Sequence, residues 1–178
     1  MSSDYTKRTC SIIYSMGRKK MSENLKLSVV RASKQDLTQI FDLENQIFGS
    51  YCLFSRSRLR YLLSSPNAYF SLCYDKERAV GFGIALRNKL RNGLFKGRIY
   101  SLGVIPEYQH RGAGSLLLRV MEDSLIKSGV SYIVLETIRG KESAAPFFMK
   151  HGYAESEFLP GYYSYGDAVR MKKVIVKK

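Results

Sequence analysis

Apolar and polar positions follow regular periods from the first patterned stretch of the chain onward. Residues 25–29 alternate between apolar residues and polar neighbours, which predicts a β-strand. Ser33 is then a candidate helix N-cap, with Asp36 three residues later as in a capping box. Apolar residues recur at helical spacing through residues 37–48, which predicts an amphipathic helix. Glu44 falls within the apolar stripe of that helix, so it is either a boundary residue or a site residue.

The middle of the chain is typical of consecutive strands joined by turns. A short helix is predicted over residues 55–63, followed by strands over residues 68–74 and 79–86. Asn92-Gly93 is a hairpin turn signal. The strand after that turn, whose clearest part is residues 99–104, should therefore pair antiparallel with the strand before it.

A helix and a buried strand follow. Pro106 should end the preceding strand, because proline lacks an N–H and favours an extended residue before it. The next helix should begin near Gly112 and end at Gly129. Its buried face is predicted from positions at helical spacing: Leu117, Val120, Met121, Ser124 and Leu125. The continuous apolar run over residues 132–135 predicts a buried strand reached by a right-handed crossover.

The last third of the chain predicts a helix and a hairpin. Leu135-Glu136 closes the buried strand, and a helix is expected from about Glu142 to His151. Residues 158–163 and 168–171 are expected to form a loop-rich hairpin. The alternation of strands and helices indicates a mixed α/β fold.

The chain is expected to divide into two parts. Residues 1–24 have no lasting period and are rich in serine, lysine and arginine, so we expect a loosely ordered basic extension. No repeat or internal linker interrupts residues 25–178, which should form one domain.

Composition and charge narrow the class of protein. The chain has 178 residues and a formal net charge of +14, a field that attracts polyphosphate cofactors and acidic partners. No zinc-finger, aromatic RNA-binding or helix-turn-helix pattern accompanies this charge, so direct sequence-specific binding to nucleic acid is not expected. No apolar run approaches the length of a membrane span, and no membrane association is expected. The three cysteines and two histidines lack metal-ligand spacing, which favours a metal-free protein of the reducing cytoplasm. We expect a monomer or a weak dimer.

The clearest chemical signal is the spacing Gln-x-x-Gly-x-Gly from Gln109 to Gly114. Glycines let main chain approach a ligand, and the N–H groups at a helix start carry partial positive charge. A strand, a proline-ended loop and a glycine-rich helix start therefore predict a site for phosphate or diphosphate. The other interpretation is a tight strand-to-helix turn. The pattern lacks a glycine of the Rossmann fingerprint and the Gly-Lys-Ser/Thr ending of a Walker loop.

The block from Tyr100 to Arg119 resembles the acetyl-CoA motif of the GNAT N-acetyltransferase superfamily, with Gln109, Gly112 and Gly114 at its defining positions. Residues 99–173 as a whole are similar to the RimI-type ribosomal-protein N-terminal acetyltransferases, and weaker similarity extends from residue 25 onward. The resemblance implies a GNAT-like fold: a twisted, mostly antiparallel sheet of about six or seven strands, flanked by about four helices. It also implies that the fourth and fifth strands splay apart and that acetyl-CoA is the acetyl donor.

The resemblance places coenzyme A on the fourth strand, the glycine loop and the helix after the fifth strand. The positions that it assigns to cofactor binding are Leu102, Gly103, Val104, Gln109, His110, Arg111, Gly112, Ala113, Gly114, Ser115, Lys141 and Phe148. Two of them depart from the family pattern, because Lys141 stands where an asparagine is usual and Phe148 where a proton-donating tyrosine is usual. A thiol has a pKa of about 8.5, so coenzyme A can leave partly as thiolate without a dedicated acid.

Glu136 matches the position that carries the general base in the family, in a Leu-Glu dipeptide at the end of the fifth strand. A second interpretation is a strand-end ion pair between Glu136 and Arg139 or Lys141. A main-chain N–H near Leu102 is the expected donor to the oxyanion that develops during acyl transfer.

The resemblance implies an acetyl-CoA-dependent N-acetyltransferase acting on a primary amine. The acceptor is expected to contact Glu44, Tyr162 and Tyr163, and one of the two tyrosines is a candidate acid in place of Phe148. An α-amine has a pKa of about 7.7–8.0 against about 10.4 for lysine, so it needs little help from a base. We therefore favour the N-terminal amine of a protein or peptide, ribosomal proteins included. The alternatives are a small amine as acceptor, or a non-catalytic acyl-CoA-binding or ribosome-associated module.

Overall fold

The computed structural model describes residues 25–49, 54–140 and 143–176. The predicted extension over residues 1–24 therefore lies outside the described residues, and so does Lys141.

One seven-stranded sheet runs through the described chain, in the order β1-β2-β3-β4-β5-β7-β6. Its strands are β1 (Leu27–Arg31), β2 (Ala68–Asp75), β3 (Arg78–Lys89), β4 (Phe95–Val104), β5 (Tyr132–Ile138), β6 (Ala154–Tyr163) and β7 (Gly166–Val174). Neighbouring strands are antiparallel except for β4 and β5, which are parallel. The predicted fold class is confirmed, including the expected hairpin of β3 and β4.

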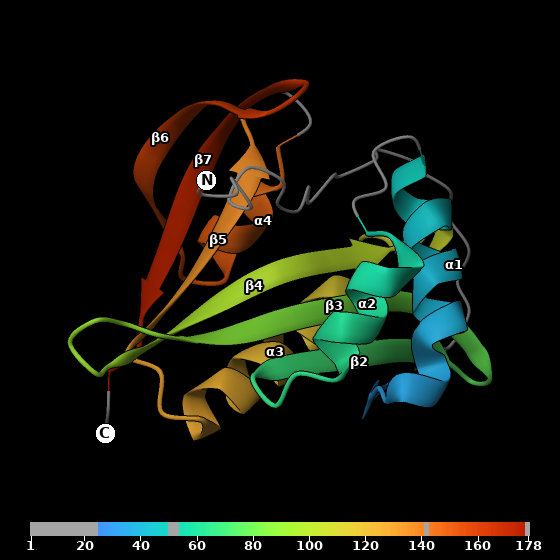
Figure 1. Ribbon diagram of the computed structural model, residues 1–178. Coiled ribbons are helices and arrows are strands. Elements are labelled where there is room, and N and C mark those ends of the chain that lie inside the picture. The colour runs from blue at the N-terminus through green and yellow to red at the C-terminus, as the bar shows by residue number, and fades with distance from the viewer. Residues whose placement is uncertain (1–24, 50–53, 141–142, 177–178) are drawn as a thin grey trace.

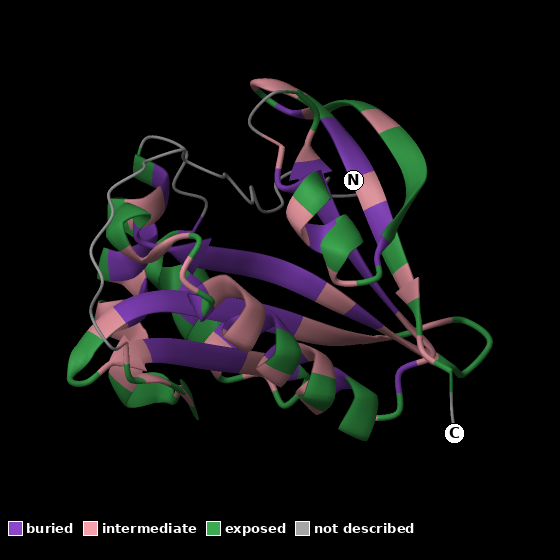
Figure 2. Cartoon of the chain, turned by 180° about the vertical axis from the view of Figure 1, so that it is seen from behind, coloured by how far each residue is buried: buried purple, intermediate pink, exposed green. Residues whose placement is uncertain are grey.

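The four α-helices of the described residues pack on the two faces of the sheet (Figure 1). They are α1 (Leu37–Phe48), α2 (Arg56–Leu63), α3 (Ala113–Lys127) and α4 (Ala145–Lys150), with 3-10 turns η1 (Lys34–Asp36) and η3 (Pro106–Tyr108). Alternate residues of β3 point to opposite faces. Phe82 packs edge-on against Phe48 of α1, with ring centroids 6.2 Å apart. A Cβ on Gly83 would instead meet Met121 of α3. Figure 2 shows α3 and α4 on the face opposite α1 and α2.

Local sequence signals account for how the first helix begins. The main-chain N–H of Ser33 donates to Asp36 Oδ2 at 2.7 Å, and Gln35 N donates to Ser33 Oγ at 3.3 Å. These bonds form the predicted capping box and satisfy N–H groups that a helix start leaves without partners. The helix then buries Ile40 and Phe48 against the sheet.

Two predictions for the last third of the chain are wrong in detail. The hairpin is present, but it consists of two long strands, β6 with ten residues and β7 with nine, and its irregularity is confined to two register shifts rather than to loops. Pro160 is tolerated in β6 because this strand lies at the sheet edge, where the register shifts between Leu159 and Tyr163. The predicted helix from Glu142 begins only at Ala145, since proline is favoured in a first turn and Pro146 occupies it.

Candidate active site

The parallel strands β4 and β5 separate after a short paired stretch. In the described chain they are in register only from Lys96 to Arg98 on β4 and from Tyr132 to Val134 on β5. Both strands continue, and Figure 1 shows them diverging toward their C-terminal ends. The predicted splay is therefore present. It leaves the β5-facing edge of Leu102, Gly103 and Val104 without a strand partner among the described residues.

The loop after β4 leads into the start of α3 through two left-handed residues. Gln109 Nε2 donates to the main-chain oxygen of Val104 at 3.0 Å, which ties the loop to the end of the strand. His110 has φ 59° and Gly112 has φ 94°, conformations that cost energy for most side chains. A Cβ on Gly112 would meet no atom within 4 Å, so the backbone angle rather than crowding requires glycine there.

The first turn of α3 presents main-chain N–H groups at this loop. Leu116 N donates to Gly112 O at 3.0 Å and begins the helical hydrogen-bond series. The N–H groups of Ala113, Gly114 and Ser115 precede it, as at any helix start. These groups and the helix dipole suit a diphosphate. Arg111 lies beside the same turn, 5.9 Å from the centroid of the Tyr108 ring.

His151, which sequence reasoning did not single out, links α4 to this turn. Its Nε2 lies 3.0 Å from Ser115 Oγ, and its Nδ1 lies 2.8 Å from the main-chain oxygen of Phe147. The end of α4 is thereby fixed against the start of α3.

Phe148 is fully buried and packs as a core side chain. Its ring makes edge contacts with Phe147 and Tyr153, with centroids 5.0 Å and 5.6 Å away. The structure thus places this predicted cofactor contact within the core rather than at an exposed surface.

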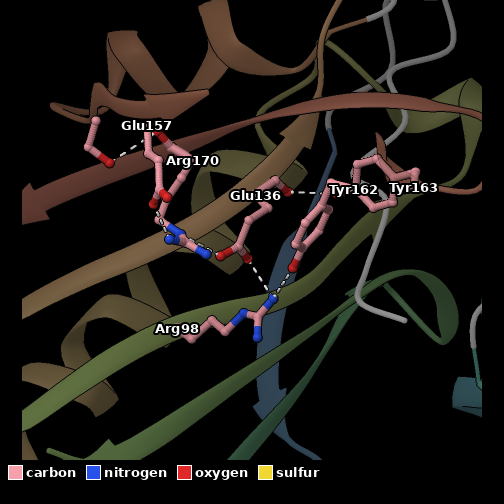
Figure 3. Close-up of polar contacts among 7 residues, drawn as sticks. Arg98, Glu136, Glu157, Tyr162, Tyr163 and Arg170 are labelled. Atoms are coloured by element: carbon pink, nitrogen blue, oxygen red, sulfur yellow. Dashed lines mark hydrogen bonds and ion pairs between the residues drawn. The ribbon is translucent and has the colours of Figure 1, made fainter. Parts of the chain in front are cut away.

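Glu136 is held between two arginines (Figure 3). Arg98 Nη2 donates to Glu136 Oε2 at 2.6 Å, and Arg170 Nε donates to Oε1 at 2.9 Å. The Glu136 side chain is 4% exposed, whereas Arg98 and Arg170 are 20% and 32% exposed. Arg139, one of the two suggested partners, does not fill this role, and Lys141, the other, lies outside the described residues. β5–β7 pairing sets Arg170 opposite Glu136, and Arg139 instead lies over the Phe158 ring.

The carboxylates near Arg170 also change the pKa of its guanidinium group. Burial alone would lower the pKa of Arg170, but the hydrogen bond and the charge of Glu136, together with the charge of Glu157, raise it above its ordinary value. Arg170 also pairs with Glu157 through Nη1. A proton taken up by Glu136 would therefore weaken its hydrogen bonds from the two arginines, because the carboxylate would lose its charge.

Two tyrosines from the end of β6 complete this cluster. Arg98 Nη2 donates to Tyr162 Oη at 2.8 Å, so one nitrogen joins Tyr162 and Glu136. Tyr163 Oη donates to the main-chain oxygen of Glu136 at 3.2 Å. Glu136, Tyr162 and Tyr163 are thus brought together, with Arg98 between two of them.

Glu44 belongs to the buried face of α1 rather than to the strands that carry this cluster. It is fully buried, and its Oε1 accepts a hydrogen bond from Phe54 N at 3.1 Å. The carboxylate therefore fixes the chain just before α2 to α1.

Arg98 and Arg170 were missed by sequence reasoning. Arg170 stands opposite Glu136 in the β5–β7 register, so a correct pairing of the two strands would have revealed it. Nothing local marks Arg98, which is 38 residues from Glu136 in the chain. Among the described residues, no cluster of three metal-ligating side chains is present, and no helix is long and apolar enough to cross a membrane.

Comparison with known proteins agrees with this geometry. The profile of the acetyltransferase (GNAT) family matches residues 35–153. N-alpha-acetyltransferase 30 of Schizosaccharomyces pombe is 28% identical over 118 residues, which cover 66% of this chain and 79% of that protein. An uncharacterized N-acetyltransferase of Methanocaldococcus jannaschii is 37% identical over 143 residues, which cover 79% of this chain and 87% of that protein.

The fold also matches a solved structure of a ribosomal-protein acetyltransferase, the type of protein that the sequence resembles. The ribosomal-protein-S18-alanine N-acetyltransferase from Escherichia coli superposes with a TM-score of 0.71 at 19% identity, covering 85% of this chain and 96% of that one. The predicted activity, acetyl-CoA-dependent N-acetylation, agrees with the family match and with the named relatives. Because the matched profile spans more than half of the sequence, the chain belongs to the GNAT family of acetyltransferases.

Proposed function

We propose that residues 25–178 form one catalytic domain that acetylates the N-terminal α-amine of a polypeptide. The observation that carries this proposal is the separation of β4 from β5, which leaves the glycine loop on one side and Glu136 on the other. The relatives named for N-alpha-acetylation and for acetylation of a ribosomal-protein alanine support a protein amine as acceptor. We therefore propose polypeptide partners, ribosomal proteins included, in the cytoplasm.

The proposed donor site lies on the α3 side of the sheet. The β5-facing main chain of Leu102, Gly103 and Val104 is available for the pantetheine arm, because no described strand pairs with that edge of β4 beyond Arg98. The N–H groups of residues 112–115 are suited to the diphosphate, with Gln109 holding the loop and His110 and Arg111 beside it. Ser115 adds a hydroxyl that His151 orients. Acetyl-CoA supplies the activated acetyl group when bound.

The proposed acceptor site is the cluster around Glu136. An α-amine is substantially neutral near pH 7.5, so it requires only local help with its departing proton. Glu136 Oε2 takes this proton, directly or through water, as its bond to Arg98 lengthens. A main-chain N–H near Leu102 stabilises the developing oxyanion. Tyr162, rather than the buried Phe148, is the proposed acid for the leaving thiolate, and Tyr163 shapes the site from β6. Glu44 has an indirect role in this proposal, because it fixes the chain before α2 to α1.

The decisive experiment measures release of free thiol from acetyl-CoA in the presence of different amines. Peptides with free N-termini, the same peptides with blocked N-termini but free lysines, and small amines such as polyamines and amino sugars form the three arms. The proposal predicts release with the first arm and little with the others. Release only with small amines would replace the polypeptide acceptor with a small one. If calorimetry showed binding of acetyl-CoA but no amine led to release of thiol, the protein would be a non-catalytic binding module.

A further inference from the structure

The open side of the Glu136 cluster carries an excess of positive charge. Side chains two apart on a strand share a face, and so do register partners on adjacent strands. Arg98 and Lys96 therefore face the same side of β4, and Arg170 and Lys172 the same side of β7, as Glu136 does on β5. On the described strands β4, β5 and β7, four cations thus share this face with the carboxylate of Glu136, and Glu157 of β6 pairs with one of them, Arg170.

This face is accessible in the described part of the chain. α4 lies on the other face of β5 (Figure 2), where Ala144 N donates to Thr137 Oγ1, and Thr137 points away from Glu136. Arg98 and Arg170 are partly exposed, whereas Glu136 is nearly buried between them. A ligand that approaches from this side reaches the guanidinium groups before it reaches the carboxylate.

Arg98 is placed to exchange one oxygen partner for another. A single nitrogen, Nη2, donates both to Glu136 Oε2 at 2.6 Å and to Tyr162 Oη at 2.8 Å. A carboxylate accepts from a guanidinium more strongly than a neutral phenol does, since both partners are charged. An incoming carboxylate can therefore replace Tyr162 on Arg98 and draw Arg98 partly away from Glu136.

We propose that the preferred acceptor is an amine with a carboxylate a few bonds away, bound with its carboxylate on Arg98 and its amine at Glu136. This inference rests on the proposed function and specifies its substrate class. The carboxylate of the acceptor then lies against the positive charge of Arg98, and its amine lies against the negative charge of Glu136. Its carboxylate also loosens the hydrogen bond between Arg98 and Glu136 Oε2, the oxygen that takes the proton. The same chemistry occurs at the N-terminus of a polypeptide that begins with Asp or Glu and in a free acidic amino acid.

The test compares isosteric acceptors by kcat/KM for thiol release at saturating acetyl-CoA. Peptides identical except for Asp, Asn, Glu, Gln, Ala or Lys at the first position form one arm, and free aspartate and glutamate form the other. We expect Asp and Glu peptides to exceed their amide counterparts by about tenfold or more, as for a hydrogen bond between charged groups. If only free aspartate and glutamate were acetylated, and the peptides were not, the acceptor with a nearby carboxylate would be a small molecule.

Matched variants assign the preference to Arg98. Arg98→Gln should reduce the Asp/Asn ratio to near one, and Arg98→Lys should leave an intermediate ratio because it keeps the charge without the planar fork. Lys96→Gln, two residues away on the same face, should retain most of the preference.

Each contrary outcome has a separate meaning. Thiol release with equal rates for Asp and Asn peptides in the wild type would overturn this inference and leave the proposed function standing, and this comparison requires no variant to fold. Absence of release with every peptide and amine would overturn the proposed function itself. If the Arg98→Gln variant kept the full preference for Asp over Asn peptides and the Arg170→Gln variant lost it, the assignment of this preference to Arg98 would be overturned.

Discussion

Replacing Glu136 with glutamine tests the proposed proton acceptor most directly. The substitution keeps the shape of the side chain and removes its charge. The glutamine oxygen can still accept from one arginine, but its NH₂ group then faces a second donor, so one of the two charge-assisted bonds is lost. Acetyl-CoA binding should persist, because the glycine loop lies on the other side of the gap.

The structure sets the expected size of two separate effects. A hydrogen bond to a charged group is worth about 1.5–3 kcal/mol. Arg98 and Arg170 are partly exposed, so water recovers some of this loss, and a destabilisation of about 2 kcal/mol is expected. For a chain of this size that corresponds to a fall in Tm of roughly 4–8 °C. Loss of a general base should lower kcat by about 100- to 10,000-fold.

Glu122→Gln supplies the matched control. Glu122 is also a largely buried, ion-paired carboxylate, bound by Lys173 Nζ at 2.8 Å and 3.0 Å, but it lies on α3, away from Glu136. The control should lower Tm by a comparable amount and leave kcat unchanged. Thermal melting, calorimetry with acetyl-CoA and thiol release on both variants give the three readouts. An unchanged kcat in Glu136→Gln would refute the proton-acceptor role, and an unchanged Tm would refute the two-arginine clamp.

Three further predictions follow from single positions. Gly112→Ala should weaken acetyl-CoA binding in calorimetry and cost about 1–2 kcal/mol of stability, because φ 94° disfavours a Cβ; full affinity and stability would contradict the backbone argument. Phe148→Tyr should lower the free energy of unfolding by about 1–3 kcal/mol without raising kcat, since its hydroxyl would enter a fully buried site; a faster enzyme would show that a proton donor at this position limits the rate. Burial, followed by the charge of Asp75, raises the pKa of the Cys73 thiol to about 11 from an ordinary 9.0. The folded state therefore keeps this thiol protonated, and stability should fall as pH rises from about 9 to about 11 in denaturant titrations; an equal fall in Cys73→Ala would assign the change to other groups.

The sequence predicts those features whose signals are local. The capping box at Ser33 and Asp36 depends on residues a few positions apart, where hydrogen-bond geometry acts directly. Helical spacing likewise predicts Leu117, Met121 and Leu125 of the buried stripe of α3, whereas Val120 and Ser124 are only partly buried. Pro106 and Gly112 likewise mark the end of β4 and the left-handed entry to α3 through their own backbone preferences.

The parts that sequence reasoning missed depend on register between distant strands. Arg98 and Arg170 reach Glu136 from positions 38 and 34 residues away, and only the pairing of β5 with β4 and β7 brings the three together. The length of β6 was underestimated for a similar reason. Pro160 and Gly161 favour a loop locally, yet pairing with β7 on either side of a register shift keeps the strand intact.

The register of β5 also determines on which side of the sheet each reactant meets the protein. Glu136 and Thr137 are neighbours that point to opposite faces: Glu136 toward Arg98, and Thr137 toward α4, where its Oγ1 accepts from Ala144 N. A slip of one residue would exchange the two. The burial of Ile133 and Leu135 on the α3 side opposes such a slip, because it would turn both apolar side chains away from the core. The apolar pattern that first predicts a buried strand is therefore also what keeps Glu136 on the side of the gap away from the glycine loop.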